Sequence, residues 1–190
     1  SPRAVGSMNE SAEVVTIKKP SECSTAELQD FVAFVLAGGE VTAVGLDVRV
    51  KEAEALVFLV QDGCLKGIAA VKNPDQNYKN KVFRKARASV QANEFPFELG
   101  WVFVLPSSRG AGLSYKLVEA ALAVTSGQGI FATSRSDNMP MHKVLKSHGL
   151  YCHGNAYTSS RGIHQLTLFV SNIGQQGAPE GRAASDASLS

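Results

Sequence analysis

A short glycine-containing loop after an apolar run carries the residue types best suited to bind a charged ligand. It comprises, in order, Arg109, Gly110, Ala111, Gly112, Leu113 and Ser114. Successive backbone N–H groups in such a loop can converge on an anion, and a helix that begins there adds positive potential at its N-terminus. Glycine also lets the main chain approach a ligand where a side chain would intrude. The pattern therefore indicates binding of a phosphate or pyrophosphate group.

Two other phosphate-binding loops do not fit these residues. A P-loop, G-x-x-x-x-G-K-[ST], requires a lysine directly after its last glycine, and Leu113 occupies that position. A Rossmann fingerprint, G-x-G-x-x-G, requires a third glycine where Tyr115 stands. Taken alone, the loop could equally be a glycine turn ahead of an ordinary helix, so its interpretation depends on the elements around it.

Strand-like and helix-like segments alternate around the loop. Strands are predicted at residues 13–18, 55–61, 65–72, 97–105, 130–133, 152–158 and 165–170. Helices are predicted from the capping box at Ser24 to Gly38, at residues 47–54, from Leu113 onward, at residues 140–147, and in part of a polar insertion at residues 73–93. A hairpin is expected at Asp62-Gly63. Strands that alternate with helices predict an α/β fold with a mixed sheet.

Length and composition favour a soluble globular domain. The chain has 190 residues, is 44% hydrophobic, and carries 19 Lys+Arg against 17 Asp+Glu, for a net charge of +2. This balance is too even for a disordered chain or a histone-like nucleic-acid binder. The longest apolar run, residues 55–60, is far shorter than the ~18 residues that a membrane span requires.

The two ends of the chain differ from its middle. Residues 1–7 precede Met8 and resemble a vector-derived leader, and residues 171–190 are rich in Gly, Ala, Ser and Gln, which is typical of a flexible tail. We therefore expect one folded domain at residues 8–170. Its three cysteines, Cys23, Cys64 and Cys152, form no C-x-x-C pair, so neither a disulfide framework nor a metal site is expected, and the cytoplasm is the predicted location.

Two segments of the sequence resemble motifs of the GCN5-related N-acetyltransferase (GNAT) superfamily. The first is its coenzyme A pyrophosphate motif, Q/R-x-x-G-x-G/A, in which Arg109, Gly112 and Ser114 occupy the key positions. The second is N-x-x-A-x-x-x-Y-x-x-x-G-F, matched by Asn138 and by Gly149-Leu150. The order of elements also matches from residue 13 to residue 170. The resemblance implies the GNAT fold, a mixed central sheet of about six to seven strands flanked by about four helices.

The resemblance also implies an activity and a set of site residues. Members of the superfamily transfer an acyl group, usually acetyl, from acetyl-CoA to an amine by direct attack in a ternary complex. By this likeness the backbone from Arg109 to Ser114 would hold the pyrophosphate. The main chain of Phe103 and Val104 would pair with the pantetheine arm, with one amide as oxyanion donor. Asn138 would contact the coenzyme near its pantetheine.

Glu98 is the predicted general base. It lies eleven residues before Arg109, as does the strand glutamate of the histone-acetyltransferase branch, and regular alternation would place it on one face with Gly100, Val102 and Val104. A carboxylate on a partly buried face beside Trp101 could remove a proton from the amine through a water. The open alternative is an edge-of-strand glutamate paired with a surface lysine.

The general acid of many relatives is missing from its usual position. They carry a tyrosine seven residues after the asparagine, and Leu145 occupies that position here. The nearby Tyr151, Tyr157, His142 and His148 could substitute, although each fits a structural or solvent-facing role better. Cys152 is expected to be a small buried thiol. The leucine motivates a second hypothesis, a non-catalytic sensor or scaffold that binds CoA esters.

A basic insertion is the remaining candidate for binding. Residues 72–87 contain six Lys or Arg and one Asp, for a local charge of +5. Its cations could attract an acidic acceptor, an RNA or the coenzyme's 3′-phosphate, but a solvated helix face is the preferred interpretation. A third hypothesis, an RNA-acting acetyltransferase, depends on this segment, although nucleic acid is not the favoured partner.

Superfamily members are often homodimers, and no residue here indicates an oligomeric state.

Overall fold

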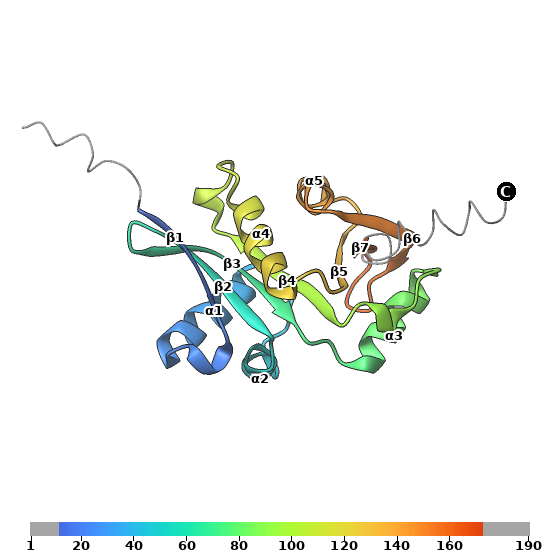
Figure 1. The fold of residues 1–190 in the computed structure, drawn as a ribbon, viewed down its shortest axis with the longest axis horizontal. Helices are drawn as coiled ribbons and strands as arrows, with labels where there is room; N and C mark the ends of the chain where they lie inside the picture. Colours follow the sequence, from blue (N-terminus) through green and yellow to red (C-terminus); the bar gives the residue numbers. More distant parts are fainter. Residues whose placement is uncertain (1–11, 173–190) are drawn as a thin grey trace, which may run out of the picture. The chain divides into compact units, whose positions relative to one another are not determined.

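The computed structural model describes residues 12–172, and the elements within that range follow the predicted order (Figure 1). The strands are β1 (Glu13–Lys18), β2 (Ala55–Gln61), β3 (Cys64–Lys72), β4 (Phe97–Val104), β5 (Ile130–Arg135), β6 (Leu150–Thr158) and β7 (Gln165–Ser171). The α-helices are α1 (Thr25–Ala37), α2 (Leu46–Lys51), α3 (Gln76–Lys85), α4 (Leu113–Thr125) and α5 (Met139–Ser147). The leader predicted at residues 1–7 and residues 173–190 of the tail predicted at 171–190 lie outside the described residues. The predicted start of the tail is wrong at Ser171, which ends β7.

The strands are hydrogen-bonded in the order β1-β2-β3-β4-β5-β7-β6. The pairs β1–β2, β2–β3, β5–β7 and β6–β7 are antiparallel, and β4 runs parallel to β5 where Phe97 and Glu98 lie opposite Ile130 and Phe131. The prediction of a mixed sheet is therefore confirmed. In the described range, no helix has the length and apolar character needed to cross a membrane.

The chain divides into two compact units. The first contains the residues up to Asn73 together with Leu99–Val124, and the second contains Pro74–Glu98 together with the residues from Thr125 onward. The first unit thus holds β1, β2, β3, α1, α2, nearly all of α4 and most of β4. The second holds α3, β5, α5, β6, β7 and the first two residues of β4.

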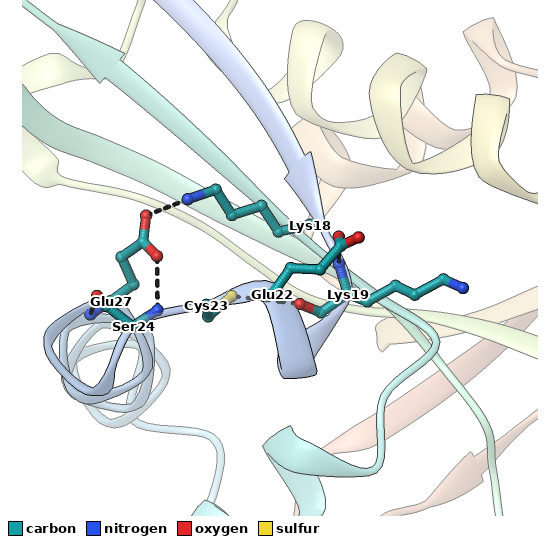
Figure 2. Close-up of polar contacts among 6 residues, drawn as sticks. All are labelled: Lys18, Lys19, Glu22, Cys23, Ser24 and Glu27. Carbon is teal, nitrogen blue, oxygen red and sulfur yellow. Dashed lines mark hydrogen bonds and ion pairs between the residues drawn. The ribbon is translucent and has the colours of Figure 1, made fainter.

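A capping box fixes the start of α1 in the first unit (Figure 2). The Ser24 hydroxyl accepts from the Glu27 N–H at 3.1 Å, and the Glu27 carboxylate accepts from the Ser24 N–H at 2.8 Å. The same carboxylate accepts from Lys18 Nζ at 2.6 Å, which ties α1 to β1. Because these contacts set the direction of α1, Phe31 and Val35 face the sheet and pack in a core with residues of α2, β2 and β3.

The core of the second unit joins α3 to the sheet. Val82 and Phe83 of α3 and its C-cap residue Ala86 pack with Phe95, which precedes β4, and with three strand residues, Phe131, Leu168 and Val170. At Gly154, where φ is +77°, an added Cβ would lie 2.2 Å from the Ala86 carbonyl oxygen, so only glycine permits this approach. The next residue, Asn155, donates its N–H to that oxygen at 2.7 Å. The predicted helix in the insertion is confirmed, and its C-terminal end is held against β6.

Candidate functional site

The loop after β4 has the backbone geometry of an anion site. A turn at Pro106–Ser108 follows the strand, and Gly110 and Gly112 adopt positive φ angles of 91° and 76°. A Cβ added at either glycine would meet nothing within 4 Å, so the space around both is open. No acceptor among residues 12–172 takes a hydrogen bond from the N–H groups of residues 110–114. These donors are available to an anionic ligand, as the sequence indicates.

Arg109 holds the loop against the end of β4. Its Nε donates to the Val104 carbonyl oxygen at 2.9 Å, and its guanidinium carbon lies 5.5 Å from the centre of the Phe103 ring. Three predicted coenzyme-binding residues of the first unit are therefore in mutual contact. The side chain of Arg109 positions the loop, which leaves the backbone as the donor of hydrogen bonds to a ligand.

The interior of β4 departs from a regular strand at Trp101. Its φ is +54°, a region that residues with a Cβ rarely adopt, and the Trp101 ring lies 6.0 Å from Phe31 and 4.4 Å from Lys72 Nζ. The strict alternation assumed for residues 98–104 is wrong at this point, because the left-handed residue interrupts the extended backbone. A strained residue inside a strand is more often found near functional sites than elsewhere.

Glu98, the predicted base, lies in the second unit and is almost completely buried. Its side chain is 4% exposed, and its Oε2 accepts a hydrogen bond from the Tyr78 hydroxyl of α3 at 2.9 Å. The alternative of a surface glutamate is therefore wrong. The sequence does not single out Tyr78, because its spacing of four residues from Val82 and eight from Ala86 is also that of an ordinary helix face.

Two tyrosines share the surroundings of Glu98. Burial and the negative charge of Glu98 raise the pKa of Tyr78, so its phenol stays protonated and can donate. Burial, followed by the charge of Glu98, raises the pKa of Tyr157 on β6 to about 12. The Tyr157 hydroxyl oxygen is buried and has no hydrogen-bond partner in the described structure. The site thus combines one buried carboxylate with two neutral phenols.

We expect Tyr157→Phe to raise the free energy of unfolding by about 1 kcal/mol, because a buried hydroxyl without a partner costs stability. Urea denaturation of the variant and the wild type measures the difference. Tyr151→Phe is the matched control, since the Tyr151 side chain is 46% exposed and its change should stay within about 0.5 kcal/mol of zero. A loss of stability in Tyr157→Phe would show that the hydroxyl has a partner in solution.

Asn138 caps α5 in the second unit. Its Oδ1 accepts from the Met141 N–H at 3.2 Å, and its own N–H donates to the Arg135 carbonyl at 3.0 Å. Because the side-chain oxygen is used by the helix, a contact with the coenzyme would fall to the exposed amide nitrogen. The position of the Asn138 side chain is therefore fixed by its role as the N-cap of α5, a role that the sequence motif alone does not reveal.

The side chains at and near position 145 differ in burial and in their hydrogen-bond partners. Leu145 is 1% exposed and packs in the interior, while the ring of the buried His142 bonds to the Arg135 carbonyl and lies 4.8 Å from Phe169. His148 bonds to a carbonyl of α5. Cys152 is exposed, so its prediction as a buried thiol is wrong: its side chain lies on an outward position of β6.

Four of the six cations of the basic insertion are solvated, whereas Lys72 is half-buried and Lys79 is buried. Lys81, Arg84, Lys85 and Arg87 are exposed, as the preferred interpretation predicts. Lys79 is 5% exposed and donates from Nζ to the Phe95 carbonyl at 3.1 Å, and burial lowers its pKa. In the part of the chain that the structure describes, no three His, Cys, Asp or Glu side chains group closely enough to hold a metal ion.

Solved structures share this fold at low sequence identity. An acyl-CoA N-acyltransferase from Pseudomonas aeruginosa is 13% identical, with 84% of this chain and 99% of that chain covered at a TM-score of 0.62. ElaA of Escherichia coli is 14% identical, with 82% and 98% covered at 0.60. The yncA protein of Salmonella typhimurium, solved with its cofactor acetyl-CoA, is 14% identical, with 85% and 94% covered at 0.58. These likenesses establish the acyl-CoA N-acyltransferase fold.

The family follows from the sequence match. Residues 27–150 match the family model described as the acetyltransferase (GNAT) family. The chain therefore belongs to the GNAT acetyltransferase family, which confirms the resemblance found in the sequence and supports acyltransferase activity and binding of an acyl-CoA. No curated protein matches the chain.

Proposed function

We propose that this chain transfers an acetyl group from acetyl-CoA to a primary amine of a small molecule or protein, by direct attack in a ternary complex. The observation that carries the proposal is the loop of residues 110–114. Its N–H groups have no acceptor in the described structure, and two left-handed glycines leave the space around it open. In a chain of the GNAT family, these donors fit the pyrophosphate of coenzyme A.

Each predicted residue has a proposed role in this reaction. The N–H groups from Gly110 to Ser114 hold the pyrophosphate, and the main chain of Phe103 and Val104 pairs with the pantetheine arm. One of those amides donates to the thioester oxygen as negative charge develops on it. Asn138 contacts the coenzyme through its amide nitrogen.

Glu98 acts on the acceptor amine. An ammonium ion has no lone pair, so it must lose a proton before its nitrogen can attack the thioester carbon. The carboxylate of Glu98 takes that proton, directly or through a water. The new C–N bond forms as the C–S bond breaks. The nitrogen then releases its second proton to solvent, and the thiolate takes up a proton from a source other than position 145, because Leu145 has none to give.

The buried Leu145 favours one alternative, a chain that binds CoA esters without transfer. An activity assay distinguishes the two functions: the protein is mixed with acetyl-CoA and a panel of amines, and thiol release is followed over time. Turnover above the hydrolysis blank supports the enzyme. Thermal stabilisation by acetyl-CoA without turnover on any amine class supports the non-catalytic binder, and absence of both contradicts the two proposals together.

The RNA-acting alternative depends on the four exposed cations of the insertion. Affinity for RNA that falls steeply with salt would support it, and salt-independent or absent binding would contradict it.

We also propose that residues 8–170 act as one acetyltransferase domain, since the family match extends over both compact units. Three free thiols, two of them exposed, favour the reducing cytoplasm as its location. Light scattering tests the homodimer that the superfamily resemblance implies.

A further inference from the structure

The helix inserted between β3 and β4 presents one side chain to the predicted base. Tyr78 lies in the first turn of α3, where Asp75 caps the helix by accepting from the N–H groups of Asn77 and Tyr78 at 3.0 and 3.2 Å. The cap fixes the backbone at the position from which the phenol extends. The residue as a whole is 40% exposed, whereas its hydroxyl reaches the almost fully buried Glu98.

Three contacts hold α3 in the second unit and leave Tyr78 little freedom to move. Lys79, the next residue, buries its side chain and donates to the Phe95 carbonyl at 3.1 Å. Phe83 packs its ring 5.3 Å from that of Phe131, the residue opposite Glu98 on β5. At the other end, the Ala86 carbonyl accepts from Asn155 at 2.7 Å. The segment from Lys79 to Ala86, directly after Tyr78, is thus fixed to β5, β6 and the residue Phe95.

We propose that Tyr78 is the positioning residue of this site: its hydroxyl holds the carboxylate of Glu98 in one orientation. The inserted helix α3 would then contribute to the catalytic site and would not be only a peripheral surface helix. This inference rests on the proposed function of Glu98 as general base. Tyr78 itself transfers no proton in the reaction.

The groups around the carboxylate support this assignment. Tyr78 faces Glu98 from α3 and Tyr157 faces it from β6, and the charge of Glu98 raises the pKa of both phenols. The Thr133 side chain of β5 acts on the pKa of Tyr78 in the opposite direction. Both phenols therefore remain neutral at physiological pH, and Tyr78 remains the donor.

Tyr78→Phe removes one hydroxyl and keeps the ring, so it tests the hydrogen bond alone. We expect the acidic limb of the pH profile of kcat/KM to move to higher pH by about 1 unit, because the carboxylate loses a donor to its charged form. At pH values below the limb, kcat/KM falls by roughly tenfold, and the KM for acetyl-CoA is unchanged.

Tyr151→Phe is the matched control, since it makes the same chemical change on an exposed ring of β6. Its acidic limb should coincide with that of the wild type. An acidic limb that stays in place in Tyr78→Phe, or that moves equally in both variants, would overturn the proposal.

A second measurement keeps this inference separate from the proposed function. Carbon-13 labelling of the glutamate side-chain carboxyls follows the titration of Glu98 directly, assigned by comparison with Glu98→Gln. A titration midpoint that moves upward in Tyr78→Phe, and not in Tyr151→Phe, supports the contact even in a chain that shows no turnover. An unchanged midpoint overturns the role of Tyr78 whatever the activity, while turnover that is absent in the wild type contradicts only the proposed function.

Discussion

Glu98→Gln is expected to lower kcat by roughly 10²- to 10⁴-fold, the range that a positioned general base contributes. Glutamine has nearly the same shape, and its amide oxygen can still accept from the Tyr78 hydroxyl, so the buried site keeps its packing. It cannot take a proton from an ammonium ion. The KM for acetyl-CoA should therefore stay within about twofold of the wild type, as expected when only the transition state loses an interaction.

The measurement is steady-state thiol release across pH, with a control that changes charge without touching the site. Glu94→Gln provides it, because Glu94 lies four residues earlier in the same unit and its side chain is exposed. That variant should retain full activity and a normal pH profile. In Glu98→Gln, the acidic limb should disappear together with the rate. Equal activity of the two variants would exclude Glu98 as the base.

Local patterns in the sequence were enough to predict the elements and the anion loop. The capping box at Ser24 needs only residues 24–27, and the loop at Gly112 needs only a strand end, two glycines and a helix start. Both depend on contacts between neighbours in the chain. The strands followed from their apolar runs for the same reason. This explains why the fold and the conformation of the loop at residues 110–114 could be predicted from the sequence.

The partner of Glu98 depends on contacts distant in sequence. Tyr78 lies 20 residues earlier, and its hydroxyl reaches the carboxylate only because α3 packs on the second unit through Phe83 and Ala86. Spacing shows that a helix has an apolar face but does not show what the face covers. The burial of Lys79 has the same origin, since a lysine in a basic run otherwise indicates a solvated position.

The backbone at Trp101 is a third feature that sequence patterns do not reveal. Nothing in a tryptophan favours a φ of +54°, so the conformation must be stabilised by its contacts with Phe31 and Lys72. Alternation along a strand assumes that every residue is extended. The assumption therefore fails where tertiary contacts hold one residue in the left-handed region of backbone angles. For this reason the side-chain alternation predicted for β4 does not hold beyond Trp101.

Gly112→Val is expected to weaken binding of acetyl-CoA by roughly 10²-fold. A β-branched residue disfavours the φ of +76° that Gly112 adopts, and its side chain would occupy space that the ligand requires. Losing one or two hydrogen bonds to a charged group, at about 1.5–3 kcal/mol each, gives an effect of this size, since 1.4 kcal/mol corresponds to tenfold. Calorimetric titration with acetyl-CoA measures the change in Kd.

Backbone strain alone could lower affinity, and Gly39→Val separates it from loss of the loop. Gly39 has the same φ of +76°, equally open space around it, and lies in the same unit just after α1. Both variants should lose about 1–2 kcal/mol of stability, because both force a side chain into the left-handed region. Only Gly112→Val should lose the coenzyme. Equal weakening in the two variants would mean that the loop of residues 110–114 holds no part of acetyl-CoA, and the proposed function would lose the observation that carries it.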